Sequence, residues 1–360
     1  SELDDTRPIP GNNIRTTIDL QLQLFCENLM TNKKGVILVG DPLSGGVLAA
    51  TSAPDYSPDF FTGLITESNW KDMSTNQDKP LLNRYIQGTY IPGSIVKMIT
   101  QAALLKQDNF DKNNKYHCPG FYQFGDRIFG CWFTEGHGSL NLVEAMSVSC
   151  DVYFYKTVTE LSLENLYDTF NQFGFGSKTN IDIPNEASGL VPDKSYMSKR
   201  YGKYGWSRGV LLNLAIGQGE LLVTPIQILN YINLLSTKGS SPNSHFVFVD
   251  NLPQNVKPEL SSDIWSNIHN GLRSAIISSN GTGKKSDPNF NDFLVFGKTG
   301  TAENPHGDNH AWFVGWADYN EKKYSIVILL ENAGSGGAVA APLAKKVFEK
   351  IIENSRFASR

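Results

Sequence analysis

A serine and a lysine three residues apart, Ser94 and Lys97, could act as nucleophile and base on one turn of a helix. Pro92 and Gly93 favour a turn before a helix expected over 92–106, which would place Ser94 near the helix N-terminus. Free N–H groups and the helix dipole favour a developing oxyanion there. The lysine can accept the serine proton if burial and nearby positive charge lower its pKa. Taken alone, the S-x-x-K spacing also fits a surface helix pair that arises by chance.

Two further motifs follow in the order that serine acyl transfer requires. The sequence S-C-D at 149–151 has the form S-x-[ND], and K-T-G-T at 298–301 ends a β-rich run. These three motifs together form the active-site set of penicillin-binding proteins and serine β-lactamases. In a strand, Thr299 and Thr301 share one face, where two hydroxyls could hold a carboxylate. Gly300 would leave room for an extended peptide alongside the strand.

The expected secondary structure places strands at both ends of the chain and helices in the middle. A hairpin is predicted for 35–39 and 47–51, and late strands for 294–301, 310–317 and 324–331. Helices are predicted for 17–29, with Thr17 as N-cap, for 341–352, and for most of 140–270 outside loops at 174–177 and 182–201. The simplest assembly is an α+β fold with one antiparallel sheet. The first and last helices cover one of its faces, and a helical lobe borders a cleft.

Composition narrows the class of protein. The 360 residues carry 32 basic and 36 acidic side chains, a net charge of −4 with no long run of one sign, so a nucleic-acid partner is not expected. The longest aliphatic run, 326–330, is far short of the ~20 residues of a membrane span. The acidic start does not read as a signal peptide. The chain is expected to be either soluble or part of a larger anchored protein.

Flanking segments extend the match beyond the three motifs. Residues 12–19, the sequence A-I-G-Q-G at 215–219 with V-T-P at 223–225, and H-A-W-F at 310–313 resemble segments of class B penicillin-binding proteins, most closely the elongation-type penicillin-binding protein 2 branch. The resemblance implies the penicillin-recognising fold, a five-stranded antiparallel sheet with helices on both faces plus a helical lobe. It also implies a lead-in over 1–13, a remnant of an upstream pedestal or linker, and a transpeptidase domain over 14–360.

The resemblance implies a peptidoglycan D,D-transpeptidase that needs no cofactor for acyl transfer. Ser94 would attack the penultimate D-Ala of a stem peptide ending in D-Ala-D-Ala, and a neighbouring stem peptide would then accept the acyl group. β-Lactams would acylate the same serine. Lys97 would be the base toward Ser94, and Ser149 would relay a proton to the leaving nitrogen and bond both lysines.

The same resemblance assigns the substrate carboxylate to Lys298, Thr299 and Thr301. The backbone N–H groups of Ser94 and Thr301 would form the oxyanion hole. Asp151 stands where many relatives carry Asn, and an ionised Asp only accepts hydrogen bonds. We take it as a marker of the elongation branch whose contacts stay open at this point.

A structural zinc site is predicted from the spacing C-x12-C-x5-H-x12-C of Cys118, Cys131, His137 and Cys150. Some penicillin-binding protein 2 relatives resemble this, with ligands that end at the middle residue of S-x-D. A Cys118–Cys131 disulfide is the alternative, reasonable in an oxidising periplasm, but it leaves Cys150 and His137 without a role. His117 could replace Cys118 as a ligand.

Two other functions share the three motifs. A serine β-lactamase would need a means to hydrolyse the acyl-enzyme, and no E-x-x-L-N sequence lies between Ser149 and Lys298. A β-lactam sensor domain would be acylated once and then signal. The resemblance to the cell-wall enzyme implies a periplasmic domain of a protein anchored in the inner membrane. It also implies a membrane glycosyltransferase and a rod-shape scaffold protein as partners.

Overall fold

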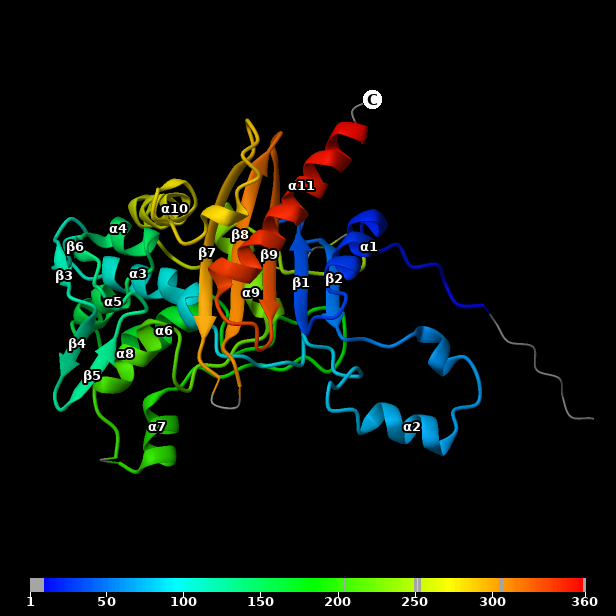
Figure 1. The fold of residues 1–360 in the computed structure, drawn as a ribbon, viewed down its shortest axis with the longest axis horizontal. Helices are drawn as coiled ribbons and strands as arrows, with labels where there is room; N and C mark the ends of the chain where they lie inside the picture. The colour runs from blue at the N-terminus through cyan, green and yellow to red at the C-terminus, as the bar shows by residue number, and fades with distance from the viewer. Residues whose placement is uncertain (1–9, 204, 249–250, 252–253, 305–306, 359–360) are drawn as a thin grey trace, which may run out of the picture.

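A five-stranded antiparallel sheet organises the molecule (Figure 1). The computed structural model describes residues 10–358 except 204, 249–250, 252–253 and 305–306, so most of the predicted lead-in lies outside the described residues. In spatial order the strands are β2 (Val47–Ala53), β1 (Gly35–Gly40), β9 (Lys322–Leu330), β8 (His310–Tyr319) and β7 (Leu294–Ala302). The predicted α+β fold with one antiparallel sheet is confirmed.

The early hairpin joins the late strands through β1. Gly35 pairs with Ala53 of β2 on one side and with Leu330 of β9 on the other. All six residues of β1 are buried. Their side chains alternate between two cores, because successive residues of a strand face opposite sides of the sheet. A strand buried on both faces reads as a continuous apolar run, which is how V-I-L-V appears in the sequence.

Helices α1 (Leu20–Leu29) and α11 (Ala341–Ala358) cover one face of the sheet (Figure 1). Their apolar side chains share a core with those of β1, β8 and β9 that point to this face. The prediction that the first and last helices cover one face is therefore confirmed. The first of them begins later than predicted. Asp19 is the N-cap, accepting from Leu22 N at 3.0 Å, whereas the Thr17 hydroxyl donates to Val47 O at 2.6 Å.

The other face is covered by α9 (Pro225–Thr237) and by a lobe of helices (Figure 1). The lobe helices pack with α9 around the larger of the two cores; they are α3 (Lys97–Leu105), α4 (Leu142–Ser147), α5 (Asp151–Val158), α6 (Leu163–Gln172), α8 (Gly209–Ala215) and α10 (Ser262–Ile277). The side chain of Arg273 on α10 donates to Val295 O of β7 at 2.8 Å and so ties the lobe to the edge of the sheet.

The expected loop over 182–201 is partly wrong. Its second part is the helix α7 (Lys194–Tyr201), whose N-cap Asp193 accepts from Tyr196 N at 2.6 Å. Of its residues only Met197 is buried, so the sequence lacks the apolar stripe that identifies a helix. The capping Asp was the one local signal of its start.

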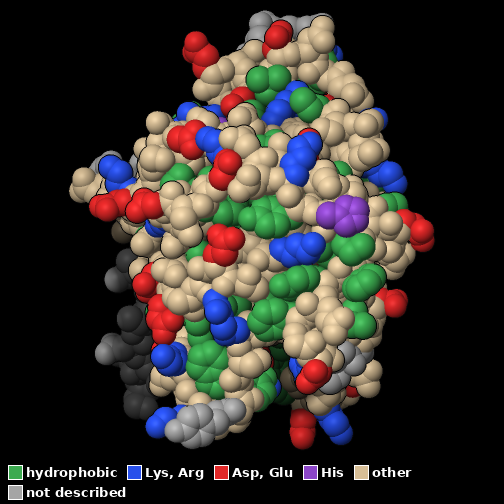
Figure 2. Space-filling model, turned by 90° about the vertical axis from the view of Figure 1, so that its left-hand side faces the viewer, with side chains coloured by type: hydrophobic (Ala, Val, Ile, Leu, Met, Phe, Trp, Pro, Cys, Tyr) green, Lys and Arg blue, Asp and Glu red, His purple; other side chains and the backbone are tan. Residues whose placement is uncertain are grey.

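Two small sheets interrupt the lobe between α3 and α4. Strand β3 (Tyr116–Cys118) pairs with β6 (Gly138–Leu140), and β4 (Phe121–Phe124) pairs with β5 (Arg127–Gly130). Figure 2 shows the lobe side of the molecule, where hydrophobic side chains gather among charged ones. Phe121 and Ile128 of the second sheet are 50% and 70% exposed, so this insert contributes apolar surface.

An arm over residues 55–82 extends away from the sheet (Figure 1). It carries a short 3-10 helix, η1 (Pro58–Phe61), and the helix α2 (Glu67–Ser74), neither of which has a buried residue. The buried Arg84 holds its base, donating to Pro54 O, Lys79 O and Asp78 O and to the Glu331 carboxylate at 3.0 Å. Two short turns of helix complete the fold, η3 (Lys284–Ser286) and η4 (Gly336–Ala340).

Within the described residues, no helix combines the length and apolarity that crossing a bilayer would need.

Candidate active site

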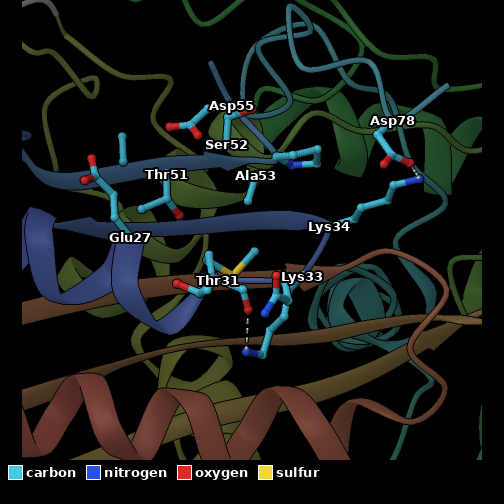
Figure 3. Close-up of a pocket in the computed structure, with 13 residues that line it drawn as sticks. Glu27, Thr31, Lys33, Lys34, Thr51, Ser52, Ala53, Asp55 and Asp78 are labelled. Carbon is cyan, nitrogen blue, oxygen red and sulfur yellow. Dashed lines mark hydrogen bonds and ion pairs between the residues drawn. The ribbon is translucent and has the colours of Figure 1, made fainter. Parts of the chain in front are cut away.

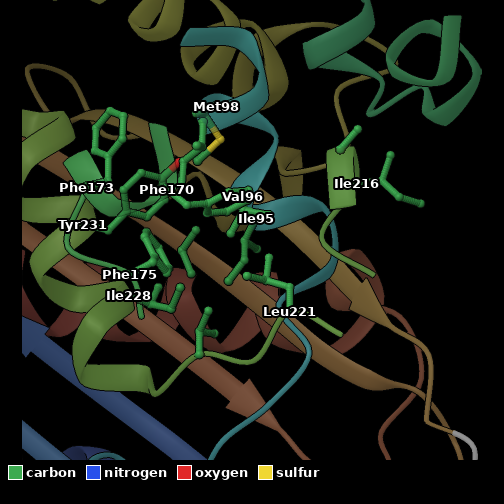
Figure 4. Packing of buried hydrophobic residues seen from close by; sticks show 14 of the residues in the cluster. Ile95, Val96, Met98, Phe170, Phe173, Phe175, Ile216, Leu221, Ile228 and Tyr231 are labelled. Carbon is green, nitrogen blue, oxygen red and sulfur yellow. The ribbon is translucent and has the colours of Figure 1, made fainter. Parts of the chain in front are cut away.

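The candidate nucleophile lies in a 3-10 turn, η2 (Gly93–Val96), that runs directly into α3. Ser94 is half-buried, whereas Ile95 and Val96 are fully buried. Figure 4 shows Ile95 and Val96 packed into the apolar cluster that also contains Phe170. Two buried anchors between the serine and the start of α3 thus fix the turn, while the serine stays partly exposed. Ser94 lies at the beginning of the helix, as the Pro-Gly sequence predicted.

The Lys97 amine is buried and directed at the second motif. It donates to Ser149 O at 2.9 Å, to Ser149 Oγ at 3.3 Å and to Asp151 Oδ1 at 2.7 Å. An ammonium has three N–H donors, so these contacts use all of them. The predicted contact with the Ser94 hydroxyl is not among the hydrogen bonds of the described residues. In this arrangement the Lys97 amine forms a buried ion pair with the Asp151 carboxylate.

Ser149 connects two helices and lies between two lysines. It stands between the end of α4 and the Cys150 N-cap of α5, with a left-handed backbone at φ 55°. A non-glycine residue held there is strained, a pattern that clusters at functional sites. Its hydroxyl accepts from Lys298 Nζ at 2.7 Å as well as from Lys97. The turn therefore brings one hydroxyl between two buried amines.

The second amine, Lys298, has a pKa well below that of an ordinary lysine. Burial is the main cause and the positive charge of Lys97 adds to it, while Asp151 acts in the opposite direction. Its Nζ also donates to Thr299 O at 3.0 Å. The environment of Lys298 thus favours the neutral amine, which can accept a proton from Ser149.

The K-T-G strand β7 forms an edge of the sheet beside the nucleophile. Thr299 is buried and Thr301 is half-buried. A Cβ at Gly300 would lie 2.7 Å from Ile95 Cγ2 and 3.1 Å from Pro92 O. The space that glycine leaves is thus occupied by the turn that carries Ser94, which we call the nucleophile turn. This corrects the expectation that the space is kept for a peptide ligand.

Asp151 accepts on both carboxylate oxygens. Oδ1 faces Lys97, and Oδ2 accepts from the backbone N of Trp132 at 3.0 Å. An asparagine would present an NH₂ group to one of these two donors. This pair of donors explains a carboxylate at the third position of S-x-[ND]. The sequence carried no signal for Trp132, whose indole also donates to Val148 O at 3.0 Å.

The predicted metal ligands gather behind Ser149. Cys118, Cys131, His137 and Cys150 place their ligand atoms within 4.8 Å of one another. All three sulfurs belong to buried, free thiols, and His137 Nδ1 lies 3.7 Å from Cys118 Sγ and 3.5 Å from Cys131 Sγ. Three sulfurs and one imidazole nitrogen in a closed, buried set match the ligands of structural zinc. His117 is exposed and outside the cluster.

A cavity of about 710 Å³ lies elsewhere, between the end of α1 and strand β2 (Figure 3). Its lining includes Glu27, Lys33, Lys34, Asp55 and Asp78 but no residue of the three motifs. Figure 3 shows the Lys34–Asp78 ion pair, 2.5 Å long, at its border. The cavity is therefore separate from the site that the three motifs form.

Comparisons with known proteins agree with this geometry. The penicillin-binding protein transpeptidase domain matches residues 35–349. The peptidoglycan D,D-transpeptidase MrdA of Haemophilus influenzae is 32% identical over 372 residues, covering 96% of this chain and 57% of that protein. The chain thus spans little more than half the length of this curated relative.

Two solved structures are similar throughout the chain. Pseudomonas aeruginosa PBP2 in complex with WCK 5153 has a TM-score of 0.87 at 32% identity, covering 95% of this chain and 79% of that one. PBP2 from Helicobacter pylori, solved in complex with MreC, has a TM-score of 0.85 at 34% identity, covering 93% and 64%.

Proposed function

Because the chain belongs to the penicillin-binding protein transpeptidase family, we propose that it cross-links peptidoglycan stem peptides during cell elongation through an acyl-enzyme on Ser94. One observation carries this proposal. The Ser149 hydroxyl lies between the amines of Lys97 and Lys298, and Lys97 begins α3 directly after the 3-10 turn that carries Ser94. That arrangement can move protons to and from a serine nucleophile, which a serine needs near neutral pH.

The two lysines divide the proton transfers between them. Lys97 passes a proton through the Ser149 hydroxyl to Lys298. The Lys298 amine can take this proton because its lowered pKa favours the neutral form. Neutral Lys97 then accepts the proton of Ser94 as Oγ attacks the penultimate D-Ala carbonyl. The Asp151 carboxylate stabilises the ammonium that results. Protonated Lys298 then returns its proton through the Ser149 hydroxyl to the leaving nitrogen, and the terminal D-Ala departs.

Substrate binding uses the edge of β7. The hydroxyls of Thr299 and Thr301, with protonated Lys298, hold the terminal carboxylate of the stem peptide. The carbonyl oxygen lies between the backbone N–H groups of Ser94 and Thr301, where fixed donors stabilise the tetrahedral intermediate. An amine from a neighbouring stem peptide then attacks the ester and restores Ser94. β-Lactams enter through the same first step and leave the serine acylated.

A zinc ion held by Cys118, Cys131, His137 and Cys150 completes the domain as a structural group, by the fit of donor set and burial. Bound there, the ion would cross-link the insert to the turn that carries Ser149. Purification without chelator followed by elemental analysis should give one zinc per chain. Cys131→Ser should lose it, whereas Cys26→Ser, which removes a buried thiol outside the cluster, should keep it. Zinc-free protein in which only two of the four cysteines react as free thiols would favour the disulfide.

The likeness to PBP2 extends the proposal to surroundings and partners. We place the domain in the periplasm, as part of a protein anchored in the inner membrane. The Helicobacter pylori complex supports a scaffold partner of the MreC kind. A membrane glycosyltransferase would supply the glycan strands whose peptides are joined.

Intact-protein mass spectrometry after addition of benzylpenicillin tests the function. The parent chain should gain the mass of one drug molecule and keep it for hours, and Ser94→Ala should gain none. A transient adduct with accumulating hydrolysed drug would overturn the proposal in favour of a β-lactamase. The release of D-Ala from a D-Ala-D-Ala peptide, coupled to transfer onto an added amine, separates the enzyme from a sensor domain.

A further inference from the structure

Residues 216–218 connect the two segments that carry the proposed oxyanion donors. Gly217 O accepts from Gly93 N at 2.9 Å, next to Ser94. The side chain of Gln218 donates through Nε2 to Thr301 O at 3.2 Å, and its Oε1 accepts from Glu303 N at 3.3 Å. One short loop therefore holds the nucleophile turn with its backbone and the end of β7 with a side-chain amide.

The Gln218 amide acts on the free edge of β7. In an antiparallel strand, the N–H and C=O of one residue point to the same edge. Because Thr301 O points to Gln218, Thr301 N–H also points away from β8, toward the open side. Fixing this C=O limits rotation about the backbone of Thr301, and so limits where its N–H is aimed.

Tight backbone packing makes the geometry sensitive to this loop. A Cβ at Gly217 would lie 2.2 Å from Gly93 O, and one at Gly93 would lie 2.6 Å from Thr301 O. Three backbone segments therefore approach one another with no side chain between them. A displacement of any one of them changes the distance between the N–H groups of Ser94 and Thr301.

We propose that Gln218 is a positioning residue for acyl transfer, which aims the N–H of Thr301 at the oxyanion. This inference rests on the proposed function. The role needs both a donor and an acceptor on one side chain. Alanine offers neither, and glutamate would direct a carboxylate at Thr301 O.

The chain contains a matched control at the opposite edge of the same sheet. Gln23 donates through Nε2 to Ala50 O at 2.9 Å, and its Oε1 accepts from Ala50 N at 2.7 Å. Gln23 is half-buried, as Gln218 is, and pairs with the outer edge of β2 far from the three motifs. Gln23→Ala thus removes the same kind of contact at comparable exposure.

The experiment compares Gln218→Ala, Gln218→Glu and Gln23→Ala in stopped-flow acylation by benzylpenicillin, with initial binding and bond formation resolved. We expect the acylation rate constant to fall roughly tenfold or more in both Gln218 variants, below the ~10²–10³-fold loss when an oxyanion donor itself is removed. Initial binding should change little, and Gln23→Ala should acylate at the parent rate. The ester C=O stretch of the acyl-enzyme should move to higher wavenumber in the Gln218 variants, because its hydrogen bond weakens.

The outcomes separate this inference from the function on which it rests. A parent chain that is not acylated at Ser94 would remove the proposed function and the inference with it. A parent that is acylated normally, with Gln218→Ala at the same rate and an unshifted C=O stretch, would overturn the inference alone. A slower Gln218→Ala with an unshifted stretch would also overturn it, because the amide would then act on something other than the oxyanion donors.

Discussion

Asp151 combines two roles that a neutral side chain cannot fill together. Its carboxylate pairs with buried Lys97 and accepts from the Trp132 backbone. Asp151→Asn should destabilise the fold by about 2 kcal/mol or more, because the Lys97 ammonium loses its counter-charge and one donor is opposed by NH₂. Chemical denaturation with the extrapolated free energy of unfolding is the measurement.

The control for Asp151 is an ion pair of the same kind that is partly exposed to solvent. Lys323 and Asp318 are 2.6 Å apart, with 24% and 36% of their side chains exposed. Asp318→Asn should cost less than about 1 kcal/mol, as solvent-screened pairs usually do. Equal losses in the two variants would mean that burial of the Lys97–Asp151 pair is energetically unimportant.

Lys298 should leave a signature in the pH dependence of stability. Its folded pKa is lowered by burial and by Lys97, so between that value and the ordinary value of 10.5 the unfolded chain binds more protons. The free energy of unfolding therefore rises with pH across that window. Below the window, the cost of burying a charged Lys298 is fully present. The melting temperature of Lys298→Met should be higher than that of the parent at low pH, and this difference should shrink toward pH 10.

Exposed Lys322 on the same sheet provides the reference for Lys298. Lys322→Met should show no such trend with pH. A gain for Lys298→Met that is constant from pH 6 to pH 10 would contradict a lowered pKa for Lys298.

At this scale the expectation that Ser149 bonds both lysines is met, whereas the expected contact between Ser94 and Lys97 is not among the hydrogen bonds of the described residues. Ser149, Lys97 and Lys298 belong to motifs whose order and spacing identify the site. The Trp132 backbone donor to Asp151 could not be predicted from the sequence, because Trp132 lies in an irregular loop that tertiary structure brings to the S-x-D turn. Gln218 appeared only as part of a family signature, with no indication that its amide clamps a strand edge.

Among the elements, the turn at Gly217 can form only because glycine has no side chain. Gly217 has φ +73° and a Cβ there would lie 2.2 Å from Gly93 O, a backbone atom that can only yield if the nucleophile turn shifts. Gly217→Ala should therefore lose stability by more than about 2 kcal/mol and slow acylation by benzylpenicillin. Denaturation and acylation kinetics on the same samples measure both effects.

Gly219 serves as the matched variant. Its φ is +79°, but the nearest atom to a Cβ is Asn213 Cβ at 3.4 Å, an ordinary contact. Gly219→Ala should cost only the ~1–2 kcal/mol of a left-handed non-glycine residue. If both variants acylate equally slowly, backbone strain rather than the clash with Gly93 is the cause.

Elements with a strong apolar pattern were predictable, and those without one were not. The runs that became β1, β8 and β9 are apolar because both faces of the sheet are covered. Helix α7 and the small sheets of the insert bury few side chains, so nothing periodic marks them. Thr17 is a residue type that often caps helices, but its hydroxyl donates to the Val47 carbonyl instead. The actual N-cap is Asp19, two residues later.

For the molecule as a whole, Arg84 links the projecting arm to the five-stranded sheet. It is 2% exposed and joins the carbonyls of 54, 78 and 79 to Glu331 at the end of β9. Arg84→Met should cost about 3–5 kcal/mol, because it leaves the mostly buried Glu331 carboxylate with Tyr90 as its remaining hydrogen-bond partner among the described residues. Hydrogen exchange should accelerate first in residues 55–79.

The neighbouring Lys34–Asp78 pair gives the comparison for Arg84. Its side chains are 36% and 57% exposed, so Lys34→Met should change stability by less than about 1 kcal/mol and leave exchange in the arm unchanged. Unaltered exchange over 55–79 in Arg84→Met would show that the arm is held by other contacts.

The pairing of β1 with β9 also determines when the domain can fold. Gly35 pairs with Leu330, so one edge of β1 stays unpaired until the ribosome has made the chain as far as β9. At ~5–20 residues per second of synthesis, this delay is on the order of tens of seconds. During it an apolar strand stays open to aggregation, and closing so long a loop makes the final step slow. We expect nascent chains that end before β9 to need chaperone protection and to resist acylation by penicillin. Acylation by penicillin would then report that synthesis has passed β9.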